Sequence, residues 1–168
     1  IKQVIDFYSN PKNRHPVATE VGRFERLELK GLGEIVANFD TGNSARAIIH
    51  TDKWEIEGKK VVWESFGKTY THKLERLQKF EQGKWSWSSE TPIERPVIFL
   101  DIDFNGQIYK DHEFLLDERS HKTTKCLMNQ RFMRKANVMI NPAKTFVVST
   151  KHGVKPDGTF EDDAFDLF

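Results

Sequence analysis

Cysteine is nearly absent from this 168-residue chain, and its scarcity rules out two kinds of stabilising site. With only one cysteine, Cys126, the chain can form neither an intramolecular disulfide nor a cysteine-based zinc knuckle. Cys126 lies in an apolar run, so we expect a buried, unreactive thiol and not a nucleophile. A chain of this length can bury a sufficient core without such staples.

An excess of charge is also missing, because 26 lysines and arginines oppose 25 aspartates and glutamates. Basic residues are spread among acidic ones, so the sequence predicts no nucleic-acid groove. No apolar stretch approaches the ~20 residues of a membrane helix, and no signal peptide is recognisable. We therefore expect neither nucleic acid nor a membrane as a partner. The cytoplasm is the default location, although the compartment stays open because the chain starts at Ile1 and not at methionine.

Three catalytic motifs are absent as well. The six histidines show neither H-E-x-x-H nor another ligand spacing, which argues against a zinc hydrolase. There is no G-x-x-x-x-G-K-[ST] phosphate loop and no G-x-S-x-G nucleophile elbow. The sequence therefore predicts no metal and no cofactor. We expect His50, His112 and His121 to lie on the surface or to be hydrogen-bonded in the core.

Apolar and polar residues alternate through the middle of the chain, which predicts many short strands. Strands are expected at 22–29, 34–39, 45–50, 54–56, 61–63, 96–104, 107–116, 124–128, 138–140 and 145–150. Asn105-Gly106 between two of them is a strong hairpin signal. The segment Thr69–Phe80 fits a helix or a strand equally well, and 131–134 fits a helical turn. Few helical patterns and no βαβ rhythm predict an all-β barrel or sandwich.

Polar, turn-rich segments flank this region and divide the chain into three parts. We expect an N-terminal arm at residues 1–20, one β domain at 21–150 and a flexible acidic tail at 151–168. The tail contains Glu161-Asp162-Asp163-Ala164-Phe165-Asp166-Leu167-Phe168. It is either a solvated segment or a short acidic-aromatic peptide that docks on a partner.

Asp40-Thr41-Gly42 is the segment whose residues best suit a catalytic role. It follows the expected strand Glu34–Phe39, so its carboxylate ends a strand and begins a tight turn. A carboxylate in that place can be rigid, half-buried and directed at a cleft, as an acid or base for hydrolysis requires. The same tripeptide is also ordinary turn chemistry, and that interpretation stays open at this point.

The copy number of this tripeptide leads to a prediction about assembly. Two carboxylates about 3 Å apart share one proton, so that one activates water while the other protonates a carbonyl oxygen. The chain holds one Asp-Thr-Gly and no second Asp-Ser/Thr-Gly. If Asp40 acts in this way, its partner must come from another chain. A twofold homodimer would place Asp40 beside its own symmetry mate.

Six segments in the correct order resemble one known family. They are Arg23–Leu29, Ile35–Ala45, Ser86–Ile98, Phe114–His121, Leu127–Met133 and Met139–Phe146. Together they are similar to the retropepsin-like aspartic proteases, most closely to the bacterial and phage branch. Members of that branch are often labelled ATP-dependent zinc proteases, a label that does not suit a chain without the corresponding motifs. The resemblance covers roughly three quarters of the chain, from Gly22 to Ser149.

The resemblance implies a closed retropepsin-like β-barrel, a homodimer and a protein or peptide substrate. It makes Asp40 the catalytic residue, with Thr41 and Gly42 fixing its loop. It makes the segment Trp85–Val97 a flap over the substrate. Within this flap, the expected substrate contacts are Trp87, Ser88, Ser89 and Thr91. For a catalytically silent form of the fold, the phage members of the branch point to a particle-associated or scaffolding role.

The chain departs from the family pattern at several of these places. Asn43 replaces the alanine after Asp-Thr-Gly, where it would crowd the axis or change the hydrogen bonding. Asn129 replaces a glycine that permits close approach or positive φ, and asparagine is the next most tolerant residue. Gln130 stands where the family has arginine, and Pro92 stiffens the flap.

Two other functional interpretations therefore remain. The fold can serve as a catalytically silent binding or assembly module, or the chain can be an unrelated all-β binding protein in which Asp40 merely forms a turn. Arg119 also has two interpretations, an anchor for the dimer or the catalytic loop and a solvated ion pair. The four tryptophans are expected in the core, although Trp85 and Trp87 alternate with serines and could line a cleft.

Overall fold

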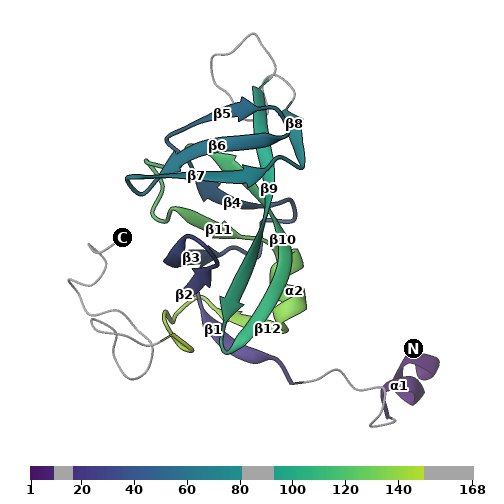
Figure 1. The fold of residues 1–168 in the computed structure, drawn as a ribbon. Coiled ribbons are helices and arrows are strands. Elements are labelled where there is room, and N and C mark those ends of the chain that lie inside the picture. The colour runs from purple at the N-terminus through teal and green to yellow at the C-terminus, as the bar shows by residue number, and fades with distance from the viewer. Residues whose placement is uncertain (10–16, 81–92, 150–168) are drawn as a thin grey trace.

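The computed structural model describes residues 1–9, 17–80 and 93–149, which form mainly β-strands (Figure 1). Within these residues the elements follow in the order α1 (Lys2–Ser9), β1 (Thr19–Gly22), β2 (Phe24–Leu29), β3 (Gly33–Phe39), β4 (Ala47–His50), β5 (Lys53–Glu57), β6 (Lys60–Ser65), β7 (Lys68–Lys73), β8 (Arg76–Phe80), β9 (Ile93–Phe104), β10 (Gln107–Asp117), β11 (Cys126–Met128), α2 (Gln130–Ala136) and β12 (Val138–Asn141).

Six of the described strands close into a barrel in the order β10-β4-β11-β3-β2-β9, and the pairing of β9 with β10 completes the ring. β8 extends the sheet from β9, and β1 pairs in parallel with β12 as a separate two-stranded sheet. Most barrel pairings are antiparallel, but β4 runs parallel to β10 and β3 parallel to β11. This closed barrel confirms the predicted all-β, retropepsin-like fold.

The predicted hairpins are present. β9 and β10 are joined by Asn105-Gly106, whose φ angles of 50° and 78° suit the turn that matches the twist of the strands. β2 and β3 pair as a second hairpin, around a turn that contains Gly31. The segment Thr69–Phe80, which fitted a helix or a strand, is extended and lies mostly in β7 and β8.

A three-stranded sheet, β5-β6-β7, covers one end of the barrel (Figure 1). Its central strand contributes the buried side chains of Val61 and Trp63 to the same hydrophobic core as the barrel. The indole Nε1 of Trp63 donates to Nδ1 of His72 at 3.0 Å, so the buried ring keeps a partner for its polar atom. Trp63 is therefore a core residue, as expected.

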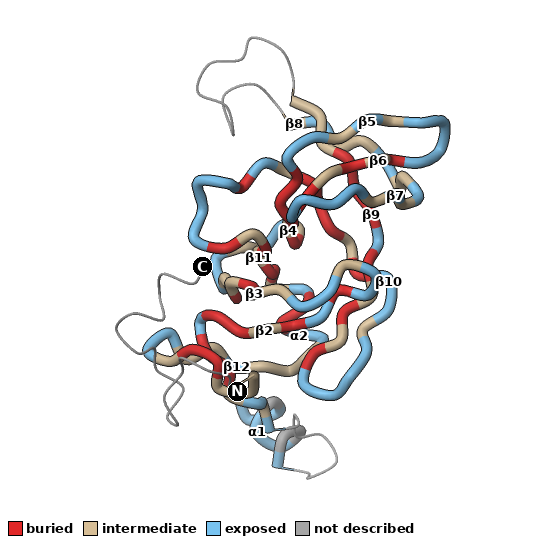
Figure 2. The backbone as a smooth tube through the Cα atoms, turned by 60° about the vertical axis from the view of Figure 1, so that its left-hand side comes forward, coloured by how far each residue is buried: buried red, intermediate tan, exposed pale blue. Residues whose placement is uncertain are grey.

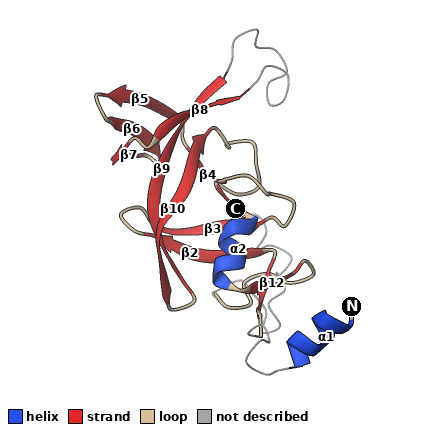
Figure 3. Ribbon diagram, turned by 90° about the vertical axis from the view of Figure 1, so that its right-hand side faces the viewer, coloured by secondary structure: helices blue, strands red, loops and turns tan. Residues whose placement is uncertain are grey.

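The core reaches the end of β3, next to Asp40, through an aromatic cluster. Figure 2 shows the buried residues concentrated along the barrel strands. Phe39 at the end of β3 packs edge-to-face against Phe104 and Phe132, with ring centroids 5.4 and 5.9 Å away. Such pairs add roughly 0.5–1.5 kcal/mol each beyond their buried area. Because Phe132 belongs to α2, this cluster fixes α2 against β3 (Figure 3).

Both helices differ from the sequence expectation. α2 is longer than the turn expected at 131–134, because Asn129 caps its start and Asn137, with φ of 50°, ends it. α1 was not foreseen within the N-terminal arm; Figures 1 and 3 show it apart from the barrel. Neither described helix has the length and apolar character to cross a membrane. The division of the chain at residues 20 and 150 stays a prediction.

The strand expected at 145–150 is wrong for the described part, which is irregular through Ser149. One backbone bond joins it to β2, where the amide of Phe146 donates to the carbonyl of Phe24 at 2.8 Å, and a side chain holds the rest. Glu25 of β2 is fully buried, and its carboxylate is the acceptor for the hydrogen bonds that fix this segment. The donors are the amides of Gly22 at 2.8 Å, Val147 at 2.7 Å and Val148 at 3.3 Å, and the hydroxyl of Ser149 at 2.5 Å.

Replacing Glu25→Gln should destabilise the protein by about 1–3 kcal/mol, because an amide NH₂ would face donors in place of an acceptor oxygen. Glu28→Gln on the same strand is the control, since Glu28 is exposed and should change stability by less than about 0.5 kcal/mol. Urea unfolding followed by tryptophan fluorescence measures both. Equal midpoints for the two variants would contradict the role assigned to Glu25.

Candidate active site

The candidate site is built where β3 and β4 are separated by a third strand. β11 pairs in parallel with β3 and antiparallel with β4, with Cys126 opposite Ala37 on one side and Ile49 on the other. The connection between β3 and β4 must therefore cross the end of β11. Asp40 is the first residue of this crossing and is half-buried.

Asp40, Thr41 and Gly42 lie together in one tight turn, as the sequence predicts for a rigid carboxylate. The amide of Gly42 donates to Oδ1 of Asp40 at 2.9 Å, and the amide of Asn43 donates to the Asp40 carbonyl at 3.0 Å. A Cβ on Gly42 would lie 3.1 Å from that same Oδ1. A side chain at position 42 would therefore displace the carboxylate by a few tenths of an ångström.

Two polar side chains clamp the loop to the start of α2. Nε2 of Gln130 donates to the Thr41 carbonyl at 2.6 Å, and the Gln130 amide donates to the Asn43 carbonyl at 2.9 Å. Nδ2 of Asn43 donates to the carbonyls of Arg46 at 2.9 Å and Met128 at 3.3 Å. Asn43 thus changes the hydrogen bonding, one of the two consequences expected of it, by bracing its own loop.

Asn129 does not adopt the left-handed conformation that the family's glycine suggested. Its φ of −115° and ψ of 168° are extended, because it caps α2. Oδ1 accepts from the amide of Phe132 at 3.3 Å, while Nδ2 donates to the carbonyl of Ala45 at 2.9 Å. Asparagine is therefore favourable here in its own right, and the side chain joins α2 to the far end of the loop that begins at Asp40.

His112 of β10 is the third member of this polar network. Its side chain is buried, and its Nε2 lies 3.2 Å from Oδ1 of Asn129. Burial lowers the pKa of His112 to about 4, with smaller contributions from nearby Arg131 and Lys135. The neutral imidazole is thus an internally hydrogen-bonded core histidine, as expected from the sequence. His50 is buried in the same way, with Nε2 2.9 Å from Oδ1 of Asp52.

Arg119 is a buried cation, so the solvated ion pair is the wrong alternative for it. Only 8% of Arg119 is exposed, and its Nε donates to the Thr124 carbonyl at 3.1 Å. Burial lowers its pKa, while the carboxylates of Asp117 and Asp40 oppose that shift. The guanidinium consequently lies within electrostatic range of Asp40 and holds the loop that precedes β11.

Ion pairs connect the strands that lead into the expected flap with the rest of the barrel. Glu113 of β10 accepts from Nε of Arg46 at 2.8 Å and also pairs with Arg76 of β8. Nε of Arg95 on β9 donates to Asp117 at 2.6 Å. Because β8 pairs with the start of β9, these contacts hold both legs of a β-ribbon. The expected substrate contacts Trp87, Ser88, Ser89 and Thr91 lie outside the described residues.

The remaining reactive groups do not form a second centre. Cys126 is fully buried, and burial raises the pKa of its thiol to about 12, which confirms the expected unreactive cysteine. Among residues 1–9, 17–80 and 93–149, no group of three or more histidine, cysteine, aspartate or glutamate side chains is arranged to hold a metal ion.

Sequence reasoning found Asp40 but did not assign a function to the residues that brace it. Gln130 was noted only as a departure from the family pattern, and His112 only as an expected core or surface histidine. Glu113 was not singled out. The available signal was the parallel change at two positions, Asn43 and Asn129, where the family has small residues. Two amides introduced on facing segments indicate a hydrogen-bonded brace.

The barrel and the loop at the end of β3 define a fold of the aspartic-protease type. A family model described as "RimB-like: Retropepsin-like aspartic endopeptidase RimB" matches residues 20–151. The chain belongs to this RimB-like family of retropepsin-like proteins.

One solved structure supports the fold independently. The crystal structure of Lpg0085, a protein of unknown function (DUF785) from Legionella pneumophila subsp. pneumophila str. Philadelphia 1, matches with a TM-score of 0.60 and 21% sequence identity. The match covers 78% of this chain and 98% of that chain, and at this identity it shows the fold alone. No curated protein matched the sequence.

Replacing Asn129→Ala should lower stability by about 2–3 kcal/mol, since the change removes the helix cap and leaves His112 and the Ala45 carbonyl without their partner. Asn129→Ser keeps the helix cap but not the other two bonds, so its stability should lie between that of the original protein and that of Asn129→Ala. Thermal unfolding of the three proteins tests this order. An alanine variant as stable as the original would contradict the assigned network.

Acid should cost this protein stability through His112. The unfolded chain protonates this histidine near pH 6.5 and the folded protein only near pH 4, so stability is present above 6.5 and lost as the pH falls to 4. The loss attributable to this residue is about 2–3 kcal/mol. His112→Gln keeps a donor for Asn129 but cannot titrate, so its unfolding free energy should fall less over this range. If the unfolding free energies of the original protein and His112→Gln fall in parallel over this pH range, His112 does not cause the loss of stability.

Proposed function

We propose that this protein is an aspartic endopeptidase that acts as a homodimer, with Asp40 of each chain supplying one carboxylate of the catalytic dyad. The observation that carries the proposal is the position of Asp40, half-buried at the end of β3 in a rigid turn of a retropepsin-like barrel. One chain has one such carboxylate, whereas the reaction needs two. A twofold axis beside Asp40 supplies the second.

The surface of the catalytic loop supports an approach by a second copy. Thr41, Gly42, Ser44 and Ala45 are exposed in the single chain. Within the described residues, the Thr41 hydroxyl forms no hydrogen bond and Oδ2 of Asp40 accepts none. The hydroxyl is thus available to bond backbone across the axis, and Oδ2 is available for the shared proton and the water.

In the proposed reaction the two Asp40 carboxylates hold one proton between them. The ionised carboxylate takes a proton from water as the water oxygen attacks the peptide carbonyl, and the protonated one donates its proton to the carbonyl oxygen. The tetrahedral intermediate then collapses: the carboxyl group that took a proton from water gives it to the amide nitrogen, the C–N bond breaks, and the other carboxylate takes back the proton from the hydroxyl group. Gly42 holds one carboxylate oxygen in place during these steps.

The proposed substrate is an extended peptide that lies between the catalytic loop and the β8–β9 ribbon. β8 pairs with β9 alone among the described strands, and the proposal places the peptide along the other edge of β8. The ion pairs of Glu113 and Asp117 hold the two legs of this ribbon over β10. Contacts of Trp87, Ser88, Ser89 and Thr91 with the substrate form part of the proposal.

Asp40→Asn should abolish cleavage of a peptide library at mildly acidic pH, by a factor of at least about 10³. The fold and the dimer should persist, because an amide oxygen can still accept from Gly42. Asp103→Asn on β9, remote from this loop, is the matched control and should keep full activity. Mass spectrometry of the library detects the products. A wild-type protein that cleaves nothing would favour the silent binding or assembly module.

Mixing the two proteins tests the shared dyad directly. If each site needs Asp40 from both chains, equal amounts of wild type and Asp40→Asn, after subunit exchange, should retain about one quarter of the wild-type activity at constant total protein. Independent sites in each chain would retain about one half. The second outcome would exclude the homodimeric dyad even if the enzyme is active.

A further inference from the structure

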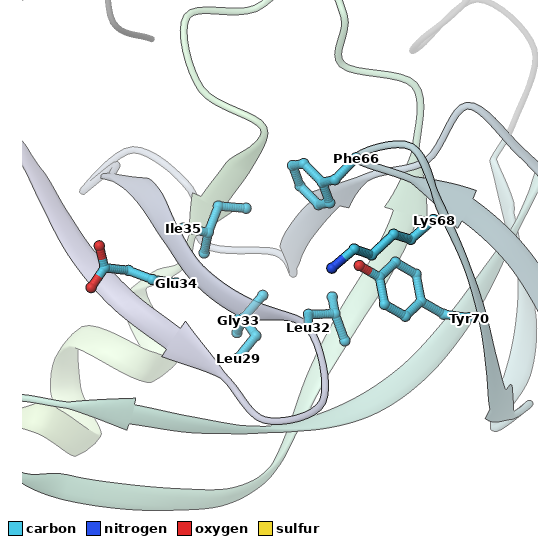
Figure 4. Close-up of a pocket in the computed structure, with 8 residues that line it drawn as sticks. All are labelled: Leu29, Leu32, Gly33, Glu34, Ile35, Phe66, Lys68 and Tyr70. Carbon is cyan, nitrogen blue, oxygen red and sulfur yellow. The ribbon is translucent and has the colours of Figure 1, made fainter.

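A groove far from Asp40 lies between the turn of the β2–β3 hairpin and the turn of the β6–β7 hairpin (Figure 4). Its volume is about 170 Å³, which is below the range of about 300–1,000 Å³ for sites of drug-sized ligands. Such a groove fits one or two side chains of a peptide. Its lining residues are Leu29, Leu32, Gly33, Glu34, Ile35, Phe66, Lys68 and Tyr70.

Phe66 forms one wall of this groove in an unfavourable backbone conformation. Phe66 and Gly67 connect β6 to β7, with φ angles of 55° and 71°. Turns of this kind favour asparagine before glycine, and a bulky residue at positive φ is rare. The ring is also 44% exposed. A strained turn that presents an aromatic ring to water is a reason to look for a ligand.

The charges of the groove favour an acidic occupant. Figure 4 shows the Lys68 ammonium and the Tyr70 hydroxyl directed to the same point, beside Leu32. The carboxylate of Glu34 points away from that point. Lys68 forms no ion pair with a described residue. An ammonium and a hydroxyl in an apolar groove suit a carboxylate next to an apolar side chain.

The chain contains such a segment, and Ser149, the last described residue before it, is linked to the groove through Arg26 and Glu34. Ser149 is held by Arg26, whose amide donates to Oγ at 2.8 Å, and Arg26 in turn lies 3.8 Å from Glu34. Nineteen residues, 150–168, follow Ser149. The eleven residues before Glu161 can span about 36 Å when extended. The segment 161–168 has four acidic and no basic residues, and it also contains the apolar side chains of Phe165, Leu167 and Phe168.

We propose that the groove binds the acidic-aromatic segment 161–168 of the same chain. An apolar side chain of the segment packs between Phe66 and Ile35, and a neighbouring carboxylate meets Lys68 and Tyr70. Tethering gives the segment a millimolar effective concentration, so a weak intrinsic affinity suffices for docking. The occupant could instead come from a second copy or from another acidic peptide, and the experiment separates these cases.

The test uses the full chain with a nitroxide spin label on Thr159→Cys. Cys126 does not compete for the label, because it is fully buried and the pKa of its thiol is about 12. Docking should broaden the amide resonances of Gly33 and Gly67 in a ¹⁵N-labelled sample and leave Gly42, at the other end of β3, unchanged. Unchanged signals from Gly33 and Gly67 would overturn the proposal.

Variants of the groove then establish what holds the segment. Lys68→Glu should reduce the docked population about tenfold, whereas Lys59→Glu on the same sheet should leave it unchanged. Combining Lys68→Glu with Asp162→Lys, Asp163→Lys and Asp166→Lys should restore docking. Equal effects of Lys68→Glu and Lys59→Glu would contradict a specific site.

Phe66→Asn removes the aromatic wall without endangering the fold, since asparagine suits this turn. Docking should weaken about tenfold while the midpoint of thermal unfolding stays level or rises. Docking that survives Phe66→Asn would overturn the role of the groove.

Contacts between copies are measured in a mixture of two kinds of chain. One kind carries the spin label and nitrogen at natural abundance, and the other carries ¹⁵N and no spin label. Broadening in that mixture would overturn docking within one chain.

Discussion

The insertion of β11 between β3 and β4 is the constraint on which the candidate site depends. Two strands that follow each other in sequence cannot pair, because the third strand bonds to both. Their connection is consequently forced across the end of β11, where the backbone of residues 40–46 has no ladder to join. Side chains from the start of α2 supply the missing partners, while the amide of Gly42 in the same loop orients the Asp40 carboxylate.

The hairpins of this fold could be predicted from the sequence because their signals are local. Asn105-Gly106 and the alternation on either side of it specify a turn and two strands at once. Non-local features could not be predicted in this way. Nothing near Thr145 indicates that a carboxylate at Glu25 replaces a strand partner, and nothing near His112 identifies Asn129 as its neighbour.

The predicted site has the same division between local and non-local information. The Asp40 turn is encoded by three adjacent residues, and the structure places them as expected. Arg119 was ambiguous because a charged residue in a polar segment is usually solvated, and its burial depends on a loop that folds over it. Asn129 was expected to tolerate a glycine conformation, whereas the start of α2 gives it a different and favourable one.

Asn43, Asn129 and Gln130 replace small or charged residues of the family with neutral amides. Each amide donates to a backbone carbonyl of the loop at residues 40–46. Neutral donors hold the loop without adding a fixed charge beside Asp40. The cation that acts electrostatically with Asp40 is the buried Arg119, whose pKa is lowered by burial while Asp40 opposes that shift.

The bonds between Glu25 and the segment after β12 have a consequence for how the protein is made. Glu25 and Val147 are 122 positions apart, and β1 at the start of the domain pairs with β12 near its end. During synthesis, β2 is exposed long before its final partners leave the ribosome. Contacts of such large sequence separation slow the search for the native topology. The barrel is therefore completed only once the segment after β12 has left the ribosome, and until then the Glu25 carboxylate remains hydrated and the edges of β2 remain open to other chains.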